Sequence, residues 1–147
     1  SPQDQGNECT VVELAKGELM LNMRNYARQE GQARQVAMSR DGGMSWEEQR
    51  IDPQLPEPRC QAAMIVASKA GKQHLLFTNP ANDTTRKQLT LSISADAGKT
   101  WTRKEMIYSG FSAYSDLLEI SAGKLLILHE GGQENPYEQI FASMVSW

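Results

Sequence analysis

Four residues of this sequence are of types that do chemistry together: the carboxylate Glu8, the guanidinium groups Arg24 and Arg86, and the phenol Tyr114. Guanidinium groups bind carboxylates, best through two parallel hydrogen bonds. A phenol has an ordinary pKa of about 10, so it acts as a nucleophile at neutral pH only beside a base. The four follow one another at intervals of 16, 62 and 28 positions, so the fold has to bring distant segments together to make one site.

The elements that must position these residues recur along the chain. Residues 39–46 and 94–101 share the pattern S-x-D-x-G-x-[ST]-W, and they begin 55 positions apart. Glycine turns between apolar runs recur at Gly17, Gly71 and Gly123, at intervals of 54 and 52. Three copies at nearly one period predict a repeat array.

Each repeat is predicted to be a meander of antiparallel strands. Its apolar runs are short, rich in Val, Ile and Leu, and bounded by Gly, Asn, Asp and Ser, whereas no run keeps the period of a helix. A period of 52 to 55 is close to a four-stranded β-propeller blade. The sequence predicts an all-β chain of about three antiparallel four-stranded blades, with repeats at roughly 8–60, 61–112 and 113–147. Because propellers close with about four to eight blades, we expect the chain to be part of a longer protein.

The two eight-residue segments, here called the box turns, are predicted to stabilise hairpins. The carboxylates of Asp41 and Asp96 can accept backbone N–H bonds across their own turns, and the fixed glycine can take a positive φ. The closing tryptophan can pack back onto the sheet. We therefore interpret Asp41 and Asp96 as structural rather than catalytic residues.

Comparing the repeats singles out the residues that differ between copies. Aligning Gly17 with Gly123 shifts the sequence by 106 positions and places Glu8 opposite Tyr114. Both precede the first strand of their repeat, so in a propeller they would point from separate blades toward one central mouth. The same shift places Arg24 opposite Glu130.

Composition excludes several classes of function. Fifteen Lys and Arg against 18 Asp and Glu give a net charge of −3, without the clustered basic residues that nucleic acid requires. No run approaches the ~18 apolar residues of a membrane helix. Cys9 and Cys60 lack the spacing of a metal site; one disulfide between them is possible, and two buried free thiols are expected.

The ordered combination of motifs resembles a known family. Residues 7–14 and 22–24, the box turns, the loop that ends at Arg86 and residues 113–117 are similar to the C-terminal half of a bacterial-type sialidase (neuraminidase) with Asp-box repeats. The resemblance covers essentially the whole chain. It implies a six-bladed β-propeller and a secreted or periplasmic protein.

The resemblance also implies roles for the site residues. Arg24 and Arg86 match two members of a three-arginine clamp for the sialic acid carboxylate, and Tyr114 matches the nucleophile. Sialidases are an exception to the two-carboxylate scheme of glycosidases because a tyrosine attacks the sugar. Glu8 matches the base that activates this tyrosine, and Glu130 resembles a carboxylate that braces an arginine of the clamp. The implied activity is that of a retaining exo-α-sialidase without metal or organic cofactor, acting on sialylated glycans.

Two parts of the family pattern have no counterpart. The first clamp arginine and the aspartate acid/base are missing, and Asp4 lies too close to Glu8 to replace the aspartate. The chain is therefore expected to need the N-terminal half of the propeller as its partner and to be inactive or nearly so alone. Two alternatives stay open: a non-catalytic Asp-box propeller that binds carbohydrate or protein, and a trans-sialidase. Contact between Tyr114 and Glu8 favours an enzyme, whereas wide separation favours a binding protein.

Overall fold

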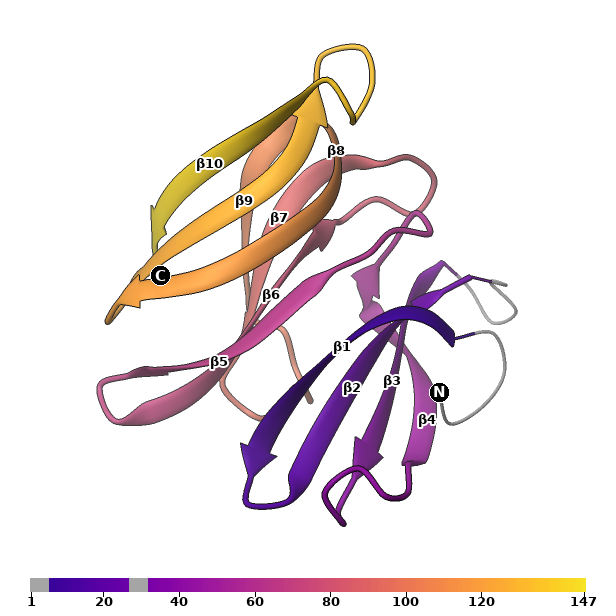
Figure 1. The fold of residues 1–147 in the computed structure, drawn as a ribbon, viewed down its shortest axis with the longest axis vertical. Helices are drawn as coiled ribbons and strands as arrows, with labels where there is room; N and C mark the ends of the chain where they lie inside the picture. Colours follow the sequence, from indigo (N-terminus) through magenta and orange to yellow (C-terminus); the bar gives the residue numbers. More distant parts are fainter. Residues whose placement is uncertain (1–5, 27–31) are drawn as a thin grey trace.

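The computed structural model describes residues 6–26 and 32–147 and shows an all-β protein (Figure 1). Asp4 lies outside the described residues. The described residues form two antiparallel sheets, one of four and one of six strands. This confirms the predicted all-β class of antiparallel strands. Within this part of the chain, no helix is long and apolar enough to cross a membrane.

The smaller sheet is a simple meander in the order β1-β2-β3-β4, each strand pairing with the next. Gly17, with φ of 76°, makes the turn between the first two strands, a conformation that glycine adopts without strain. The four strands lie within the region predicted as the first repeat, roughly residues 8–60, whose bounds stay a prediction. The strands are β1 (Gly6–Ala15), β2 (Glu18–Asn25), β3 (Ala33–Ser39) and β4 (Glu47–Pro56).

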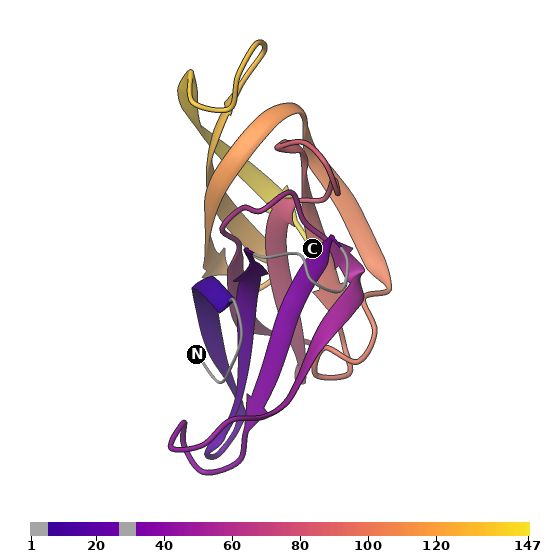
Figure 2. The ribbon, with the colours of Figure 1, turned by 90° about the vertical axis from the view of Figure 1, so that its right-hand side faces the viewer.

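The larger sheet has the order β10-β9-β8-β7-β6-β5. Its strands are β5 (Ala63–Lys69), β6 (Lys72–Pro80), β7 (Lys87–Ser94), β8 (Arg103–Ser121), β9 (Lys124–Gly132) and β10 (Gln139–Ser146). β8 is 19 residues long and strongly curved: in Figures 1 and 2 it rises to the top of the view, bends and descends again.

One strand therefore joins two repeat units. Residues 103–111 of β8 pair with β7, and residues 111–121 pair with β9. A Cβ atom at Gly110 would lie 2.9 Å from the carbonyl oxygen of Gly132, so the backbones approach too closely for another residue. The region predicted as second and third blades is thus one continuous sheet. Its division into repeats at roughly 61–112 and 113–147 stays a prediction.

The two sheets share a hydrophobic core. It combines Met20 and Val36 of the first sheet with Met64, Phe77 and other residues of the second. β5, the edge strand of the larger sheet, lies beside β1 of the smaller one (Figure 1). A second cluster, which includes Leu89, Leu125 and Ile127, fills the larger sheet on its own. The first core fixes how the two sheets face each other, and with it the residues at their common edge.

The box turns have the predicted structure. Oδ1 of Asp41 accepts the Ser45 N–H at 2.9 Å, and Oδ1 of Asp96 accepts the Thr100 N–H at 2.8 Å. Hydrogen bonds from the following hydroxyl and backbone N–H lower the pKa of each aspartate to about 2. The closing Trp101 is buried in the shared core. The hairpin role is confirmed.

The cysteines are both free, but only Cys60 is buried. The expected burial of Cys9 is wrong. Cys9 lies on the edge strand β1 and shares the outer face of that strand with the exposed Val11, because residues two apart point to the same side.

Candidate functional site

Glu8 and Tyr114 meet where the two sheets come together. Glu8 lies near the start of β1, and Tyr114 lies in the part of β8 that pairs with β9. The Tyr114 hydroxyl donates a hydrogen bond to Oε1 of Glu8, across 106 positions of sequence. The repeat alignment predicts that both residues face one mouth, and the structure brings them into contact, the outcome that favours an enzyme over a binding protein. Their catalytic roles stay predictions at this point.

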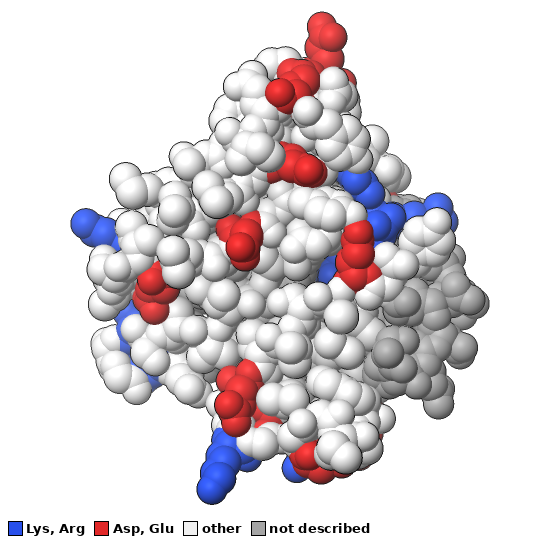
Figure 3. All heavy atoms as spheres, viewed as in Figure 1, with Lys and Arg blue, Asp and Glu red and all other residues white. Residues whose placement is uncertain are grey.

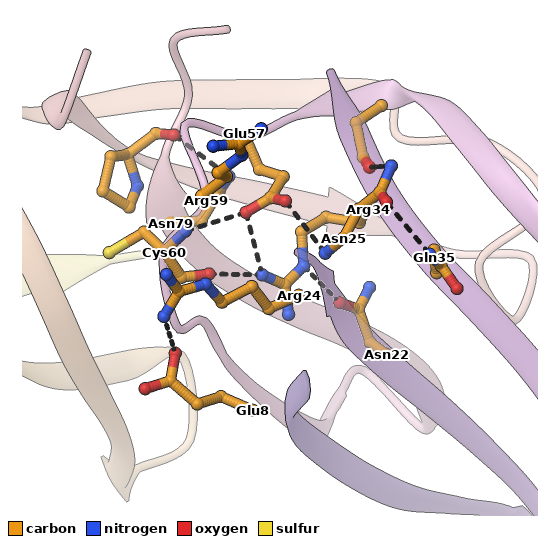
Figure 4. A network of polar contacts seen from close by, with 12 residues as sticks. Glu8, Asn22, Arg24, Asn25, Arg34, Gln35, Glu57, Arg59, Cys60 and Asn79 are labelled. Carbon is orange, nitrogen blue, oxygen red and sulfur yellow. Dashed lines mark hydrogen bonds and ion pairs between the residues drawn. The ribbon is translucent and has the colours of Figure 1, made fainter. Parts of the chain in front are cut away.

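Arg24 completes the contacts of Glu8. It lies at the end of β2, and its Nη1 is 2.7 Å from Oε2 of Glu8 (Figure 4). The side chains of Arg24 and Glu8 are 13% and 33% exposed, so the ion pair is partly shielded from water. One carboxylate oxygen thus faces the phenol and the other faces the guanidinium, which fixes the carboxylate between two partners.

These contacts determine the protonation of the site. Partial burial opposes ionisation of Glu8, but hydrogen bonds from Tyr114 and Arg24 and the charges of Arg24 and Arg86 outweigh it and lower the Glu8 pKa. The hydrogen bond to Glu8, together with partial burial, raises the pKa of Tyr114. Glu8 likewise raises the pKa of Arg24 against the effect of burial. The resting site therefore holds an anionic carboxylate beside a neutral phenol.

Arg86 approaches the same tyrosine from the loop between β6 and β7. Its Cζ lies 5.9 Å from the centre of the Tyr114 ring. Nη1 donates to the Tyr137 hydroxyl at 2.5 Å, and Nη2 donates to the carbonyl oxygen of Arg59 at 2.8 Å. Among the residues that the structure describes, no carboxylate forms an ion pair with Arg86. Its positive charge is available to an anionic ligand.

Glu130, on β9, holds the backbone at Tyr114. Its Oε2 accepts the Tyr114 N–H at 3.1 Å. In the described ranges 6–26 and 32–147, no arginine forms an ion pair with Glu130. The brace for a clamp arginine that the family resemblance implies stays a prediction.

A hollow of about 540 Å³ lies beside the phenol. Its lining includes Tyr114, Glu130, Gln61, Asp116, His129 and Ile140. The hollow is wide open, and its walls combine polar groups with the apolar side chains of Leu128 and Ile140. Of the four residues Glu8, Arg24, Arg86 and Tyr114, its lining includes Tyr114 alone. On the face shown in Figure 3, acidic side chains are scattered from top to bottom, whereas basic side chains lie mostly toward the edges.

A buried ion pair between Arg34 and Glu57 lies close to Arg24 (Figure 4). Arg34 and Glu57 have side chains that are 0% and 1% exposed, with Nη1 and Oε2 3.4 Å apart. The Glu57 carboxylate also accepts the N–H groups of Asn25 and Cys60, both at 2.9 Å. Arg34 donates to Asn22 Oδ1 at 2.7 Å and to the Cys60 carbonyl at 2.6 Å. The pair ties β2 and β3 to the segment that carries Arg59.

Sequence reasoning missed this pair and Tyr137. Glu57 directly follows the end of β4 at Pro56 and is buried. Arg34 was the available signal for the ion pair, since it is a charged residue at the start of the apolar strand β3. A charged side chain there is buried only if it has a partner. Burial lowers the Arg34 pKa to about 10, although Glu57 opposes this shift. The comparison of the repeats did not single out Tyr137 as a functional residue.

The residues that the structure describes include no group of three or more His, Cys, Asp or Glu arranged to hold a metal ion. His129 is buried against Tyr108 and Phe141, and burial lowers its pKa. It therefore serves as a neutral ring within an aromatic cluster. The chemistry that the arrangement supports is proton transfer between a phenol and a carboxylate beside an arginine that can bind an anion.

Residues 2–127 match the family model of the BNR repeat-like domain. A sialidase of Micromonospora viridifaciens is 37% identical over 132 residues, covering 86% of this chain and 20% of the relative. A sialidase of Bacteroides fragilis is 38% identical over 105 residues, covering 68% of this chain and 19% of the relative. The chain thus spans about a fifth of the length of these relatives.

Solved structures show the same kinship. The Hadza microbial sialidase Hz136 superposes with a TM-score of 0.78 at 36% identity, over 86% of this chain and 25% of that one. A leech intramolecular trans-sialidase has a TM-score of 0.79 at 19% identity, over 94% and 23%. A Trypanosoma rangeli sialidase in complex with 2,3-difluorosialic acid, described as a covalent intermediate, has a TM-score of 0.67 at 24% identity, over 94% and 23%. The last two show likeness of fold alone.

Proposed function

Because this chain belongs to the BNR repeat-like domain family and is related to sialidases, we propose that it supplies the nucleophile, the base and two arginines of a retaining exo-α-sialidase. The substrate class is terminal sialic acid on glycans. The observation that carries the proposal is the hydrogen bond between Tyr114 and Glu8 across two sheets, with Arg24 on the other oxygen of Glu8.

The chemistry explains why a phenol suits this site. A sialoside has a carboxylate on its anomeric carbon, so an aspartate or glutamate nucleophile would be repelled, whereas a neutral phenol would not. Glu8 takes the phenolic proton while the Tyr114 oxygen forms a bond to the anomeric carbon and the bond to the leaving oxygen breaks. A residue of another blade is expected to protonate the leaving oxygen. Water then attacks the same carbon and gives a proton to that residue, while the bond between the carbon and the Tyr114 oxygen breaks. Tyr114 regains its proton from Glu8, and the configuration is retained.

The arginines bind the substrate carboxylate. The contacts of Arg86 support this role because they are to neutral oxygens, which leave its charge for the substrate. The position of Arg24 supports it because Arg24 contacts Glu8, the residue that is hydrogen-bonded to Tyr114. The proton for the leaving sugar and the first clamp arginine are expected to come from other blades of the longer protein. The chain by itself is therefore proposed to be inactive or nearly so.

Replacing Tyr114 by phenylalanine in the full-length protein tests the nucleophile. We expect the variant to lose most of its turnover of an aryl sialoside and to keep its affinity for sialic acid, since only the attacking oxygen is removed. Tyr108→Phe is the matched control, because its hydroxyl bonds the Gly132 carbonyl at 3.2 Å and lies outside the proposed machinery. Undiminished turnover by Tyr114→Phe would refute the assignment.

A covalent trap provides independent evidence. Incubation of the full-length protein with 2,3-difluorosialic acid is expected to release the fluoride from carbon 2 and to add one 3-fluorosialyl group to the peptide that contains Tyr114, detected by mass spectrometry. A label on another residue would overturn the proposed intermediate. Product analysis with an added sugar acceptor separates hydrolysis from the transfer reaction of a trans-sialidase.

A further inference from the structure

Arg86 is held by two uncharged oxygens from separate loops. The Tyr137 hydroxyl, between β9 and β10, accepts from Nη1 at 2.5 Å, and the Arg59 carbonyl, between β4 and β5, accepts from Nη2 at 2.8 Å. A guanidinium has five N–H donors, so these anchors leave three for a ligand. Neutral anchors orient the fork without cancelling its charge, which is what a carboxylate-binding arginine requires.

The loop that carries Tyr137 is organised by its own carboxylate. Glu138 accepts the N–H groups of Gln133, Glu134 and Asn135 at 3.0, 2.8 and 2.7 Å. These bonds lower the Glu138 pKa, so the carboxylate is ionised at neutral pH. Oδ1 of Asn135 in turn accepts the Tyr137 N–H at 2.9 Å. The backbone of Tyr137 is therefore fixed before any ligand binds.

Close packing at the base of the loop reinforces this arrangement. A Cβ atom at Gly132 would lie 2.3 Å from the Asn135 carbonyl oxygen and 2.5 Å from Cδ of Glu138. Only glycine permits the Glu138 carboxylate to approach its backbone donors here. The loop geometry thus depends on Gly132 and Glu138, while the Tyr137 side chain is not needed to build it.

The Tyr137 side chain contributes little to packing. It is 61% exposed, and within the described part of the chain its ring makes no stacking or cation contact. Its polar side-chain contact is the one to Arg86. The ordered loop therefore holds the Tyr137 hydroxyl against Arg86, and this contact accounts for the position of an otherwise exposed side chain.

We propose that Tyr137 is a positioning residue that orients Arg86 for the carboxylate of the substrate. The inference rests on the proposed sialidase function, since it takes Arg86 as part of the clamp. Tyr137 acts on binding through Arg86 and takes no part in bond making.

The test compares Tyr137→Phe with Tyr108→Phe in the full-length protein. Tyr108 offers the matched control because its hydroxyl touches the same loop at Gly132 but has no contact with Arg86. The readouts are kcat and KM for an aryl sialoside, and the inhibition constants of sialic acid and its neutral methyl ester. The preference for the free acid over the ester reports the carboxylate contact directly.

Tyr137→Phe is expected to raise KM and to reduce the preference for the free acid by about 3- to 10-fold, the effect of one lost hydrogen bond, with kcat within about twofold of the unmodified protein. Tyr108→Phe is expected to leave the preference unchanged. Glu138→Gln, which keeps the tyrosine but weakens its loop, should shift the preference in the same direction. An unchanged preference in Tyr137→Phe would overturn the inference, as would an equal change in the Tyr108→Phe control.

Failure of the wider proposal gives a different pattern. If Tyr114→Phe keeps full turnover, or if the unmodified protein shows no preference for the free acid, the sialidase assignment itself fails. If those two results are as expected and Tyr137→Phe leaves the preference for the free acid unchanged, the sialidase assignment stands and Tyr137 is not a positioning residue.

Discussion

Replacing Glu8 by glutamine isolates the function of the carboxylate charge. In the protein, Oε1 of Glu8 accepts from the Tyr114 hydroxyl and Oε2 pairs with Arg24. The amide of glutamine has a similar shape and its oxygen can still accept the phenolic hydrogen bond. However, it cannot take the proton, so Tyr114 must lose that proton to solvent before it can attack.

The size of the effect follows from the ionisation of the phenol. With an ordinary pKa of about 10, roughly one tyrosine in a thousand is ionised at pH 7. We expect Glu8→Gln to lower kcat for an aryl sialoside by about 1,000-fold, within the range of about 10² to 10⁴ for general bases. The remaining rate should rise with pH toward the phenol pKa. KM is not expected to rise, since Arg24 is released for the substrate carboxylate.

The assay is the pH profile of kcat between pH 5 and about 10, with Glu13→Gln as the control. Glu13 lies on the same strand, and its Oε1 accepts the Gly17 N–H, a bond that an amide oxygen also makes. This control changes the same charge on β1 without touching the site, so its profile should match that of the unmodified protein. Normal turnover by Glu8→Gln at neutral pH would refute the base assignment.

Two further predictions concern stability. Glu57→Gln leaves Arg34 buried without its counter-charge, so it should lower the free energy of unfolding by about 3–5 kcal/mol, measured by urea unfolding. Glu47→Gln is the control: it removes an exposed partner of Arg40 and should have little effect on the free energy of unfolding. The lowered pKa of Asp96 means that its contribution to stability is present above the unfolded-state pKa of about 4 and is lost as the pH falls toward 2. Acid unfolding of Asp96→Asn should lack that component; an unchanged acid limb would contradict it.

Periodic features of the fold could be predicted because they depend on local physics. The box turns satisfy their own backbone groups through Asp41 and Asp96, so each pattern specifies its turn wherever it occurs. The contact between Glu8 and Tyr114 was also within reach. Repeats that share a period place equivalent positions at equivalent heights, so the shift of 106 predicted that both residues face one central mouth, where the structure shows them in contact.

Features without a repeat equivalent could not be predicted in this way. Glu57 is buried because its carboxylate accepts a hydrogen bond from Asn25 on β2 and pairs with Arg34 on β3. The residues next to Glu57 in the sequence give no indication of these two partners. Tyr137 reaches Arg86 across 51 positions, through a loop whose shape depends on Glu138. The continuous β8 was likewise missed, because a strand that changes partner has the same alternating pattern as two strands in sequence.

The two arginines differ in a way that bears on the proposed mechanism. Arg86 is held by neutral oxygens and carries its full charge before the substrate arrives, whereas Arg24 is paired with the Glu8 carboxylate. When Glu8 takes the proton of Tyr114, its negative charge is lost and Arg24 no longer has an anionic partner. Its attraction for the substrate carboxylate then increases as the bond to the anomeric carbon forms. Contacts that strengthen during the reaction lower the barrier, whereas contacts made equally before it do not. In the proposed mechanism, the ion pair between Arg24 and Glu8 would thus couple proton transfer to tighter binding at the transition state.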